Sequence, residues 1–210
     1  MEARRKVNNL LGLNVLAVLR KRPMHPYEMA TTMREWGKDQ STKINWGSLY
    51  TVVGNLEKHG FIEATETLRD GKRPERTLYQ LTAAGEAEMQ DWMRELVRQP
   101  EREYRRFETA LSLIGVLGPD EAVSLLKSRA MRLEGHAAAA EAMVREVAQN
   151  VPRMFLIEGE YAAAMLRAEA NWIRALLAEI AEGRFPGIDD WRRYHDRHDE
   201  WPWEEADEPG

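Results

Sequence analysis

The sequence predicts a mostly α-helical protein with one small β-hairpin, and three observations indicate this fold class. Apolar residues recur at helical spacing over much of the chain. One such stripe is formed by Leu49, Val52, Val53 and Leu56. Two segments, 61–68 and 76–81, have strand-like patterns and flank a glycine-containing turn, which is typical of a hairpin. The segment 123–147 carries apolar residues at alternating intervals of three and four, which indicates a long heptad seam.

The first hundred residues are expected to hold three short helices, the hairpin and a fourth helix. The three helices are expected at about residues 6–22, 26–36 and 45–59, and each is followed by a proline or a glycine that stops it. After the hairpin, Thr82 is expected to cap a helix that continues to about residue 99. This order is that of a winged helix-turn-helix domain. Two short helices alone would be weaker evidence, because many helix pairs imitate a helix-turn-helix.

The remaining chain divides into a helical segment and an acidic tail. Residues 101–185 are expected to form a helical dimerisation domain, because the heptad seam provides an apolar face. A second seam with the same spacing is predicted between Leu166 and Ile180. Residues 186–210 are expected to be an acidic, flexible tail. The predicted organisation is therefore a winged helix-turn-helix domain at 1–100, a dimerisation domain at 101–185 and a tail.

Charge and composition exclude several classes of site. The net charge is −5, but residues 1–81 hold 14 basic and 9 acidic residues, which gives +5, and the remaining 16 and 26 give −10. The basic part of the chain is thus its N-terminal third. The absence of cysteine excludes disulfides and thiolate metal sites and agrees with a cytoplasmic location. No cofactor motif and no membrane span are expected, and the N-terminus lacks the small-residue cleavage site of a signal peptide.

The helix at 45–59 is the candidate recognition helix. With its apolar stripe buried, Gly47, Thr51 and other small or polar residues face outward, with Ser48 and Tyr50 on the flanks. Such a helix would enter a major groove with its N-terminal residues towards the base edges. The alternative is an ordinary amphipathic helix with a solvated face, since any surface helix has a polar side.

The hairpin turn is the candidate wing. Its basic residues are Arg69, Lys72, Arg73 and Arg76. A basic hairpin tip neutralises phosphates along a minor groove. The alternative is a solubilising turn that protects an edge strand. The wing and the recognition helix support each other because they occur in the order that a winged helix requires.

Four stretches of the chain resemble the PadR family of transcriptional regulators. They are His25-Pro26-Tyr27-Glu28, Trp46-Gly47-Ser48-Leu49-Tyr50, Leu56-Glu57-Lys58-His59-Gly60-Phe61-Ile62 and Tyr79-Gln80-Leu81-Thr82-Ala83-Ala84-Gly85. The resemblance is specific over about residues 7–95 and looser in the C-terminal helices. The chain departs from the family at Pro26, where glycine is usual, and at Thr51, where proline commonly follows the tyrosine.

The resemblance implies DNA-binding roles for individual residues. Tyr27, Ser48 and Tyr50 would contact phosphates, although both tyrosines also have a simpler interpretation as packing residues. The groove entrance would be formed by Lys43, Asn45 and Gly47. The wing contacts would come from Lys72, Arg73 and Arg76. Thr51 adds a hydroxyl on the outward face and is expected to make a DNA contact of its own.

Two tryptophans are candidates for an effector site. Members of the family bind flat aromatic effectors near the dimer interface, so the resemblance implies this role for Trp92 and Trp172. The favoured alternative is that both rings fill the dimer core, because aromatic residues are enriched at interfaces.

These features predict a homodimeric, double-stranded-DNA-binding repressor that is released by a small aromatic effector and is not an enzyme. Twofold symmetry implies a roughly palindromic operator with half-sites about 34 Å apart or a multiple of this. The alternative is a winged-helix module that binds proteins and not DNA. A metal-dependent enzyme that uses His195 and His198 is a poor interpretation, because the sequence provides no rigid scaffold around them.

Overall fold

The computed structural model describes residues 5–38, 45–68, 76–100 and 103–197, and these form two compact units. The first unit spans Met1–Arg102 and the second spans Glu103–Gly210. The division lies two residues beyond the predicted boundary at residue 100. None of the described helices is long and apolar enough to cross a membrane.

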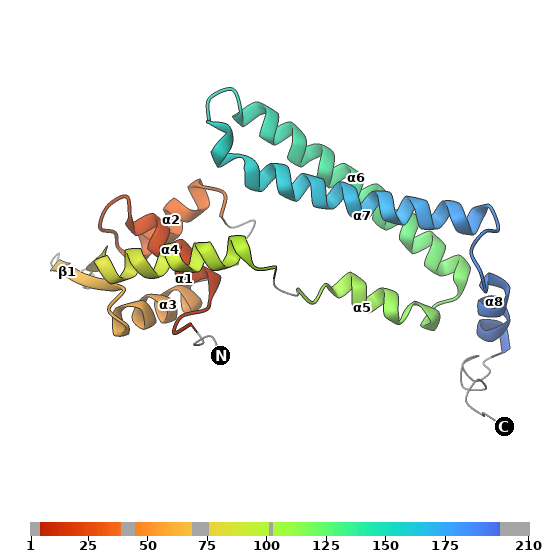
Figure 1. Ribbon diagram of the computed structural model, residues 1–210, viewed down its shortest axis with the longest axis horizontal. Helices are drawn as coiled ribbons and strands as arrows, with labels where there is room; N and C mark the ends of the chain where they lie inside the picture. The colour runs from red at the N-terminus through yellow and green to blue at the C-terminus, as the bar shows by residue number, and fades with distance from the viewer. Residues whose placement is uncertain (1–4, 39–44, 69–75, 101–102, 198–210) are drawn as a thin grey trace. The chain divides into compact units, whose positions relative to one another are not determined.

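Three helices form the core of the N-terminal unit (Figure 1). They are α1 (Leu10–Leu19), α2 (Pro26–Glu35) and α3 (Trp46–Lys58). Their apolar stripes meet in one cluster, whose fully buried side chains include Leu11, Leu16, Met29, Met33, Leu49 and Leu56. Helices α2 and α3 begin as the sequence predicts, with Pro26 in the first turn of α2 and Asn45 as the cap of α3. Helix α1 is shorter than the predicted 6–22, because Asn9 caps it and it begins at Leu10.

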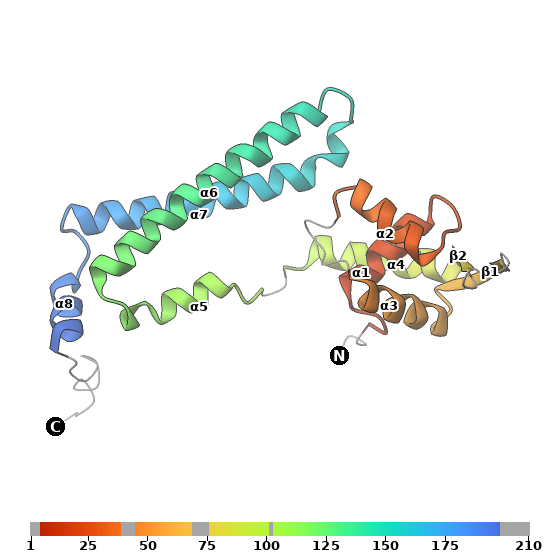
Figure 2. The same ribbon diagram turned by 180° about the vertical axis from the view of Figure 1, so that it is seen from behind.

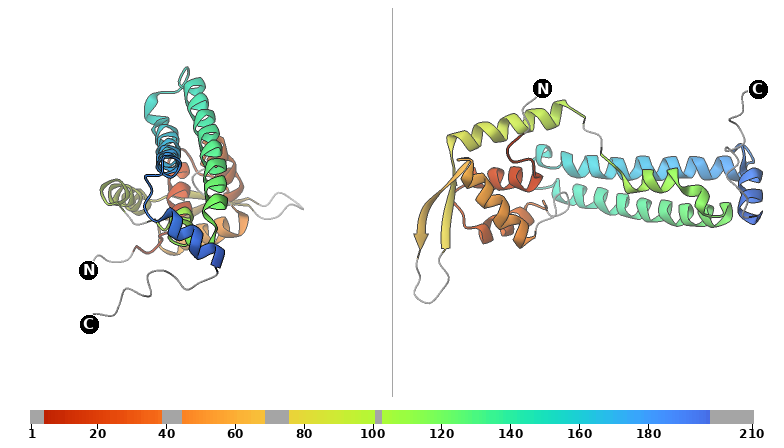
Figure 3. Two further views of the ribbon diagram at one scale, coloured as in Figure 1. Left: turned by 90° about the vertical axis from the view of Figure 1, so that its right-hand side faces the viewer. Right: turned by 90° about the horizontal axis from the view of Figure 1, so that it is seen from below.

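The hairpin is a two-stranded antiparallel sheet of β1 (Ile62–Leu68) and β2 (Arg76–Leu81). Figure 3 shows the two strands projecting from the helices of this unit. A bulge lies between Ala64 and Glu66, and it locally increases the twist of the ribbon. The base of the hairpin is joined to the segment before α2, because Met24 and Tyr79 exchange two backbone hydrogen bonds of 3.0 and 3.1 Å. The strands are thereby held against the helix-turn-helix.

Helix α4 (Ala83–Arg98) follows the hairpin and packs on α1 (Figure 2). The Thr82 hydroxyl accepts a hydrogen bond from the Gly85 amide at 3.0 Å and donates one to the Gly60 carbonyl at 2.7 Å. Gly85 is buried, and a β-carbon placed there would lie 1.9 Å from the carbonyl oxygen of Phe61. A glycine is therefore required at this position by close approach of the backbone and not by its φ angle.

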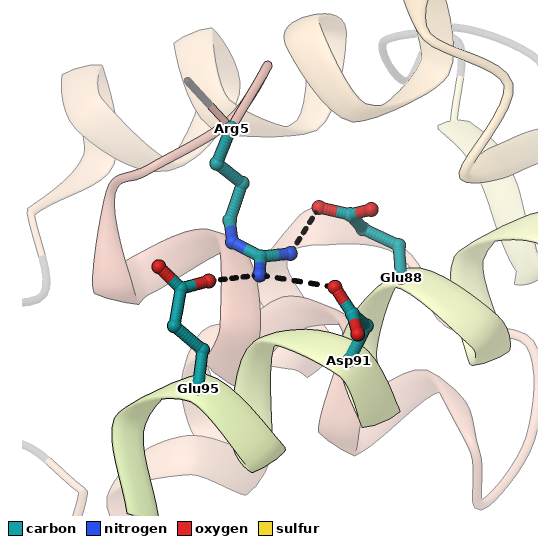
Figure 4. Close-up of polar contacts among 4 residues, drawn as sticks. All are labelled: Arg5, Glu88, Asp91 and Glu95. Atoms are coloured by element: carbon teal, nitrogen blue, oxygen red, sulfur yellow. Dashed lines mark hydrogen bonds and ion pairs between the residues drawn. The ribbon is translucent and has the colours of Figure 1, made fainter. Parts of the chain in front are cut away.

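The N-terminal arm is fastened to α4 by Arg5 (Figure 4). Its guanidinium donates to Glu88 at 2.6 Å and to Asp91 at 3.3 Å, and it also pairs with Glu95. The same guanidinium lies 5.3 Å from the centroid of the Trp92 ring. Burial alone would lower the pKa of Arg5, but the hydrogen bonds to Glu95 and Glu88 outweigh it and raise the pKa. One cation thus holds three carboxylates of α4 together.

A long helical hairpin forms the centre of the C-terminal unit. Its arms are α6 (Pro119–Val147) and α7 (Ile157–Ala181), which run side by side in Figure 1 and are joined through η2 (Arg153–Phe155). The two seams interlock and bury Leu126, Ala130, Leu133, Ala170, Ile173 and Leu177. The seam of α6 was predicted to serve dimerisation. The structure instead buries it within one chain, because the seam of α7 packs against it.

Ion pairs along the hairpin match the antiparallel register of its arms. Arg174 and Glu134 form a bidentate pair at 2.8 Å, and Arg167 and Glu141 form another at 2.9 and 3.1 Å. These hydrogen bonds raise the pKa values of both arginines and lower those of both glutamates. Exposed pairs of this kind contribute little energy each, so their main effect is on register.

Two short helices complete this unit. The first, α5 (Arg106–Ser112), continues into η1 (Ile114–Val116) and packs against the hairpin core. The second, α8 (Ile188–Arg197), corrects the prediction of a flexible segment from residue 186. It is held because the Trp191 indole donates to the Leu117 carbonyl at 2.9 Å, and an Arg192 guanidinium nitrogen lies 3.8 Å from an Asp120 carboxylate oxygen. The predicted tail beyond Arg197 lies outside the described residues.

Candidate nucleic-acid interface

Helix α3 has the two faces that a recognition helix needs. Leu49, Val52, Val53 and Leu56 are buried against α1 and the rest of the core, as their spacing predicts. The opposite face is exposed and is formed by Gly47, Thr51, Gly54, Asn55 and Lys58. Because Gly47 and Gly54 carry no side chains, the backbone of this face is free to approach a surface closely.

The first turn of α3 is organised by its own side chains. The Asn45 side-chain oxygen accepts a hydrogen bond from the Ser48 amide at 2.8 Å, which caps the helix. The Thr51 hydroxyl donates to the Gly47 carbonyl at 2.9 Å. Asn45 is the cap of the helix, and its place at a groove entrance stays a prediction. The Thr51 hydroxyl retains only its acceptor capacity for an external partner.

A groove separates the beginning of α2 from β2 and contains the two predicted phosphate-binding tyrosines. Its volume is about 860 Å³, and its lining includes Arg22, His25, Tyr27, Tyr50, Thr77 and Tyr79. The side chains of Tyr27 and Tyr50 are 66% and 59% exposed. Neither tyrosine is therefore a core residue, and their phosphate contacts stay a prediction.

The walls of this groove are fixed by hydrogen bonds. His25 Nδ1 lies 2.8 Å from the Thr77 carbonyl oxygen, which ties the start of α2 to β2. The Glu28 carboxylate accepts from the His25 amide at 3.0 Å and from Arg22 at 3.0 Å, and these bonds lower the pKa of Glu28. Burial raises the pKa of Tyr79, and a hydrogen bond to Glu57 adds to the shift. The walls of the groove are thus held in place by hydrogen bonds within the N-terminal unit.

Trp46 and Arg34 form a contact that the sequence did not single out. The rings of Tyr27 and Trp46 are stacked, with centroids 5.3 Å apart and planes 8° from parallel. The Arg34 guanidinium carbon lies 5.5 Å from the centroid of the Trp46 ring. A tryptophan directly before the Gly-Ser-Leu-Tyr stretch was the available signal, but sequence spacing does not show which α2 residues it meets.

The predicted wing lies mostly outside the described residues. Its residues Lys72 and Arg73 belong to the segment 69–75, and Lys43, predicted at the groove entrance, belongs to 39–44; both segments lie outside the described residues. Arg76 opens β2, and its backbone pairs with that of Leu68. The wing contacts therefore stay predictions.

The structure places the two candidate effector-site tryptophans in different units and different environments. Trp92 is only 4% exposed and is covered by Arg5 within the N-terminal unit. Trp172 is 49% exposed and makes an edge-to-face contact with Phe107, with centroids 6.5 Å apart. A ligand therefore has access to the ring of Trp172 and not to that of Trp92.

Phe107 also lines a pocket of about 460 Å³ in the C-terminal unit, whereas Trp172 contacts Phe107 without lining this pocket itself. Its floor is apolar and includes Phe107, Leu111, Ile114, Leu126 and Leu133, and its polar lining residues are Arg129, Arg132 and His136. Arg129 is paired with Glu169 at 2.7 Å and covers the Phe107 ring at 3.8 Å. Apolar walls with a few polar groups are typical of small-molecule sites. The sequence showed these residues only as parts of helical stripes.

Only one of the two histidines considered for a metal site, His195, lies within the described residues. His195 Nε2 lies 3.3 Å from the Val116 carbonyl oxygen, and His198 is outside the described residues. Among the described residues, no group of three or more histidine, aspartate or glutamate side chains is arranged to hold a metal ion.

Comparison with known proteins gives a family match and a curated relative. Residues 15–91 match the model of the transcriptional regulator PadR-like family. The negative transcriptional regulator PadR of Bacillus subtilis is 22% identical over 180 residues, which cover 81% of this chain and 97% of that protein.

Two crystal structures of Bacillus subtilis PadR share the fold. The complex with operator DNA has a TM-score of 0.65 at 21% identity and covers 81% of this chain and 99% of that chain. The complex with p-coumaric acid has a TM-score of 0.67 at 20% identity and covers 82% and 99%. Residues 15–91 are therefore similar to the transcriptional regulator PadR-like family, and the chain shares the fold of these regulators.

Proposed function

We propose that this protein is a dimeric DNA-binding transcriptional regulator that works in the cytoplasm without catalysis. The observation that carries the proposal is α3, which buries its apolar stripe and exposes a face of small and polar residues beside the phenols of Tyr27 and Tyr50. This face suits a major groove, whose floor the helix N-terminus reads. The Bacillus relative crystallised with operator DNA supports the same role.

Each N-terminal unit would bind one half-site. Helix α3 would enter the major groove, with Gly47 and Ser48 nearest the bases and Tyr27 and Tyr50 on phosphates. Lys43 would add charge at the groove entrance. The wing would place Lys72, Arg73 and Arg76 along the neighbouring minor groove. Phosphate neutralisation would supply most of the affinity, so that binding would weaken steeply with salt.

The second copy of the chain would bind on α7. Ile157, Tyr161 and Met165 are all exposed and recur at intervals of four residues. They form one stripe on the side of α7 opposite to Ala170 and Ile173, which face α6. An exposed apolar stripe of this length marks an interaction surface. A twofold pairing of these stripes would hold two DNA-binding N-terminal units, here called heads, for a palindromic operator.

Regulation would come from a small aromatic effector. The pocket beside Phe107 has an apolar floor and the basic groups Arg132 and His136 at its edge, which suits an aromatic carboxylate. Bound DNA would occlude a promoter and repress it, as the name of the Bacillus negative regulator suggests. An effector that binds the DNA-free arrangement of the heads better would release the DNA.

The wing provides the test of DNA binding. The assay is retention of the DNA upstream of its own coding region, measured at several salt concentrations. We expect Arg73→Ala and Arg76→Ala each to weaken binding. Each should also reduce the salt slope, which is the slope of the logarithm of the binding constant against the logarithm of the salt concentration, by about one, because each removes one phosphate contact. Arg94→Gln on α4 is the matched control, because this arginine is exposed on another helix. Salt-independent retention that both wing variants leave unchanged would contradict the proposal.

That outcome would favour the second candidate, a winged-helix module that binds proteins and not DNA. The acidic composition of residues 82–210 is the observation in its favour, because a basic partner surface would complement it.

The effector site has its own test with p-coumarate as the probe. We expect p-coumarate to quench tryptophan fluorescence and to release the DNA, with most of the quenching lost in Trp172→Phe. Trp92→Phe is the matched control, because that ring is buried under Arg5 and should keep its contribution. Equal quenching in wild type and Trp172→Phe would show that Trp172 is not part of the effector site.

A further inference from the structure

Three side chains on the surface of the N-terminal unit form a single stack. Trp46, the first residue of α3, lies between Tyr27 and Arg34, both of which belong to α2. Tyr27 and Arg34 are seven residues apart, which is two helical turns or about 10 Å along the axis. The indole lies 5.3 Å from the Tyr27 centroid and 5.5 Å from the Arg34 guanidinium carbon, so that it fills the space between them.

This stack is not part of the hydrophobic core. Trp46 is 41% exposed, Tyr27 is 66% exposed, and neither belongs to the buried cluster of this unit. Apolar side chains that adjoin one another at a surface, as Trp46 and Tyr27 do, mark an interaction site more often than singly scattered ones. The packing of α2 on α3 is already provided by Met33, Leu49 and their neighbours. A role outside the core therefore accounts better for Trp46.

The stack leaves a cation in a defined position. Within the described part of the chain, no carboxylate lies within ion-pair distance of Arg34, although Arg22 and Arg5 in the same unit are both paired. An arginine over an indole face keeps its charge and its five donors while its freedom of rotation is reduced. Arg34 is thus presented to an external anion at a small entropic cost.

The position of the stack identifies the anion. In a helix-turn-helix, the recognition helix enters the groove with its N-terminus and the preceding helix crosses the sugar-phosphate backbone. Trp46 is at that N-terminus, and Arg34 lies on the same face of α2 as Tyr27, the tyrosine assigned to a phosphate. We propose that Arg34 is a ligand for a DNA backbone phosphate and that Trp46 is the positioning residue that holds it there, an inference that rests on the proposed DNA-binding function.

The test compares salt slopes of binding to the DNA upstream of the coding region. We expect Arg34→Gln to weaken binding roughly three- to tenfold and to lower the slope by about 0.9, as for the loss of one phosphate contact. Trp46→Leu removes no charge, yet it is expected to lower the slope similarly, and Trp46→Phe should restore most of it. The double variant should bind no more weakly than Arg34→Gln, because both changes remove one contact.

The controls separate this inference from the proposed function and from misfolding. Arg94→Gln should leave the slope unchanged. A wild-type protein that retains no DNA would contradict the proposed DNA-binding function itself. If wild type binds and Trp46→Leu keeps the full slope, or if the two variants act additively, the positioning role is wrong. A fall in the melting temperature of Trp46→Leu with an unchanged slope would show a merely structural role and would also overturn the inference.

Discussion

Replacement of Gly85 by alanine is expected to destabilise the N-terminal unit by about 3 kcal/mol or more. The new β-carbon would lie 1.9 Å from the Phe61 carbonyl oxygen and 2.8 Å from its carbonyl carbon. Both atoms belong to the backbone, so no rotamer change relieves the overlap. Helix α4 would have to shift, which would break the Thr82 cap and the 3.1 Å hydrogen bond from the Thr82 amide to Phe61.

Thermal melting measures this effect. A loss of about 3 kcal/mol in a domain of this size lowers the melting temperature by roughly 15 °C. Gly54→Ala is the matched control, because that glycine is also helical and its β-carbon would meet nothing within 4 Å. It should raise stability by about 0.5–1 kcal/mol, as expected for glycine replaced inside a helix. Equal melting temperatures for the two variants would show that the backbone approach at Phe61 is not tight.

Introduction of a charge into the α7 stripe is expected to dissolve the dimer. In Met165→Arg, pairing of two stripes would bury two unpaired cations among Ile157, Tyr161 and their copies, at a cost of several kcal/mol. Met165 is 38% exposed in the single chain, so the substitution should leave the chain itself folded. A separated head also loses the effective concentration supplied by its partner, and DNA affinity should fall by about a hundredfold.

Light scattering and DNA retention read out the two consequences. Wild type should have twice the chain mass of 24.3 kDa, and Met165→Arg should have the mass of one chain. Met131→Arg is the matched control, because Met131 is 58% exposed on α6 and lies away from the α7 stripe. A Met165→Arg protein that remains dimeric would show that the second copy binds another surface.

Local patterns were sufficient for the N-terminal unit. The apolar stripe of α3, the Asn45 cap and the strand pattern around 62–81 follow from spacing and cap chemistry, and the structure confirms each of them. Stripes and caps act over one or two helical turns, so their meaning does not depend on the rest of the fold. The exposure of Gly47 and Thr51 follows from the same stripe.

Spacing alone misassigned two features of the C-terminal unit. The heptad seam between Val123 and Val147 indicates an apolar face but not its partner, which is α7 of the same chain. The segment 188–197 is highly polar and was predicted to be flexible, yet Trp191 and the chain before α6 hold it as a helix. Both errors concern contacts between residues that are distant in sequence.

The sequence by itself determined the order of the elements, the buried and exposed faces of α3 and the family that residues 15–91 resemble, because each depends on local periodicity or on a contiguous motif. Only the tertiary structure decided that Trp92 is covered by Arg5, that Trp172 is open beside Phe107 and that Trp46 lies between Tyr27 and Arg34. These arrangements depend on the angles at which helices pack, and no residue spacing specifies such angles.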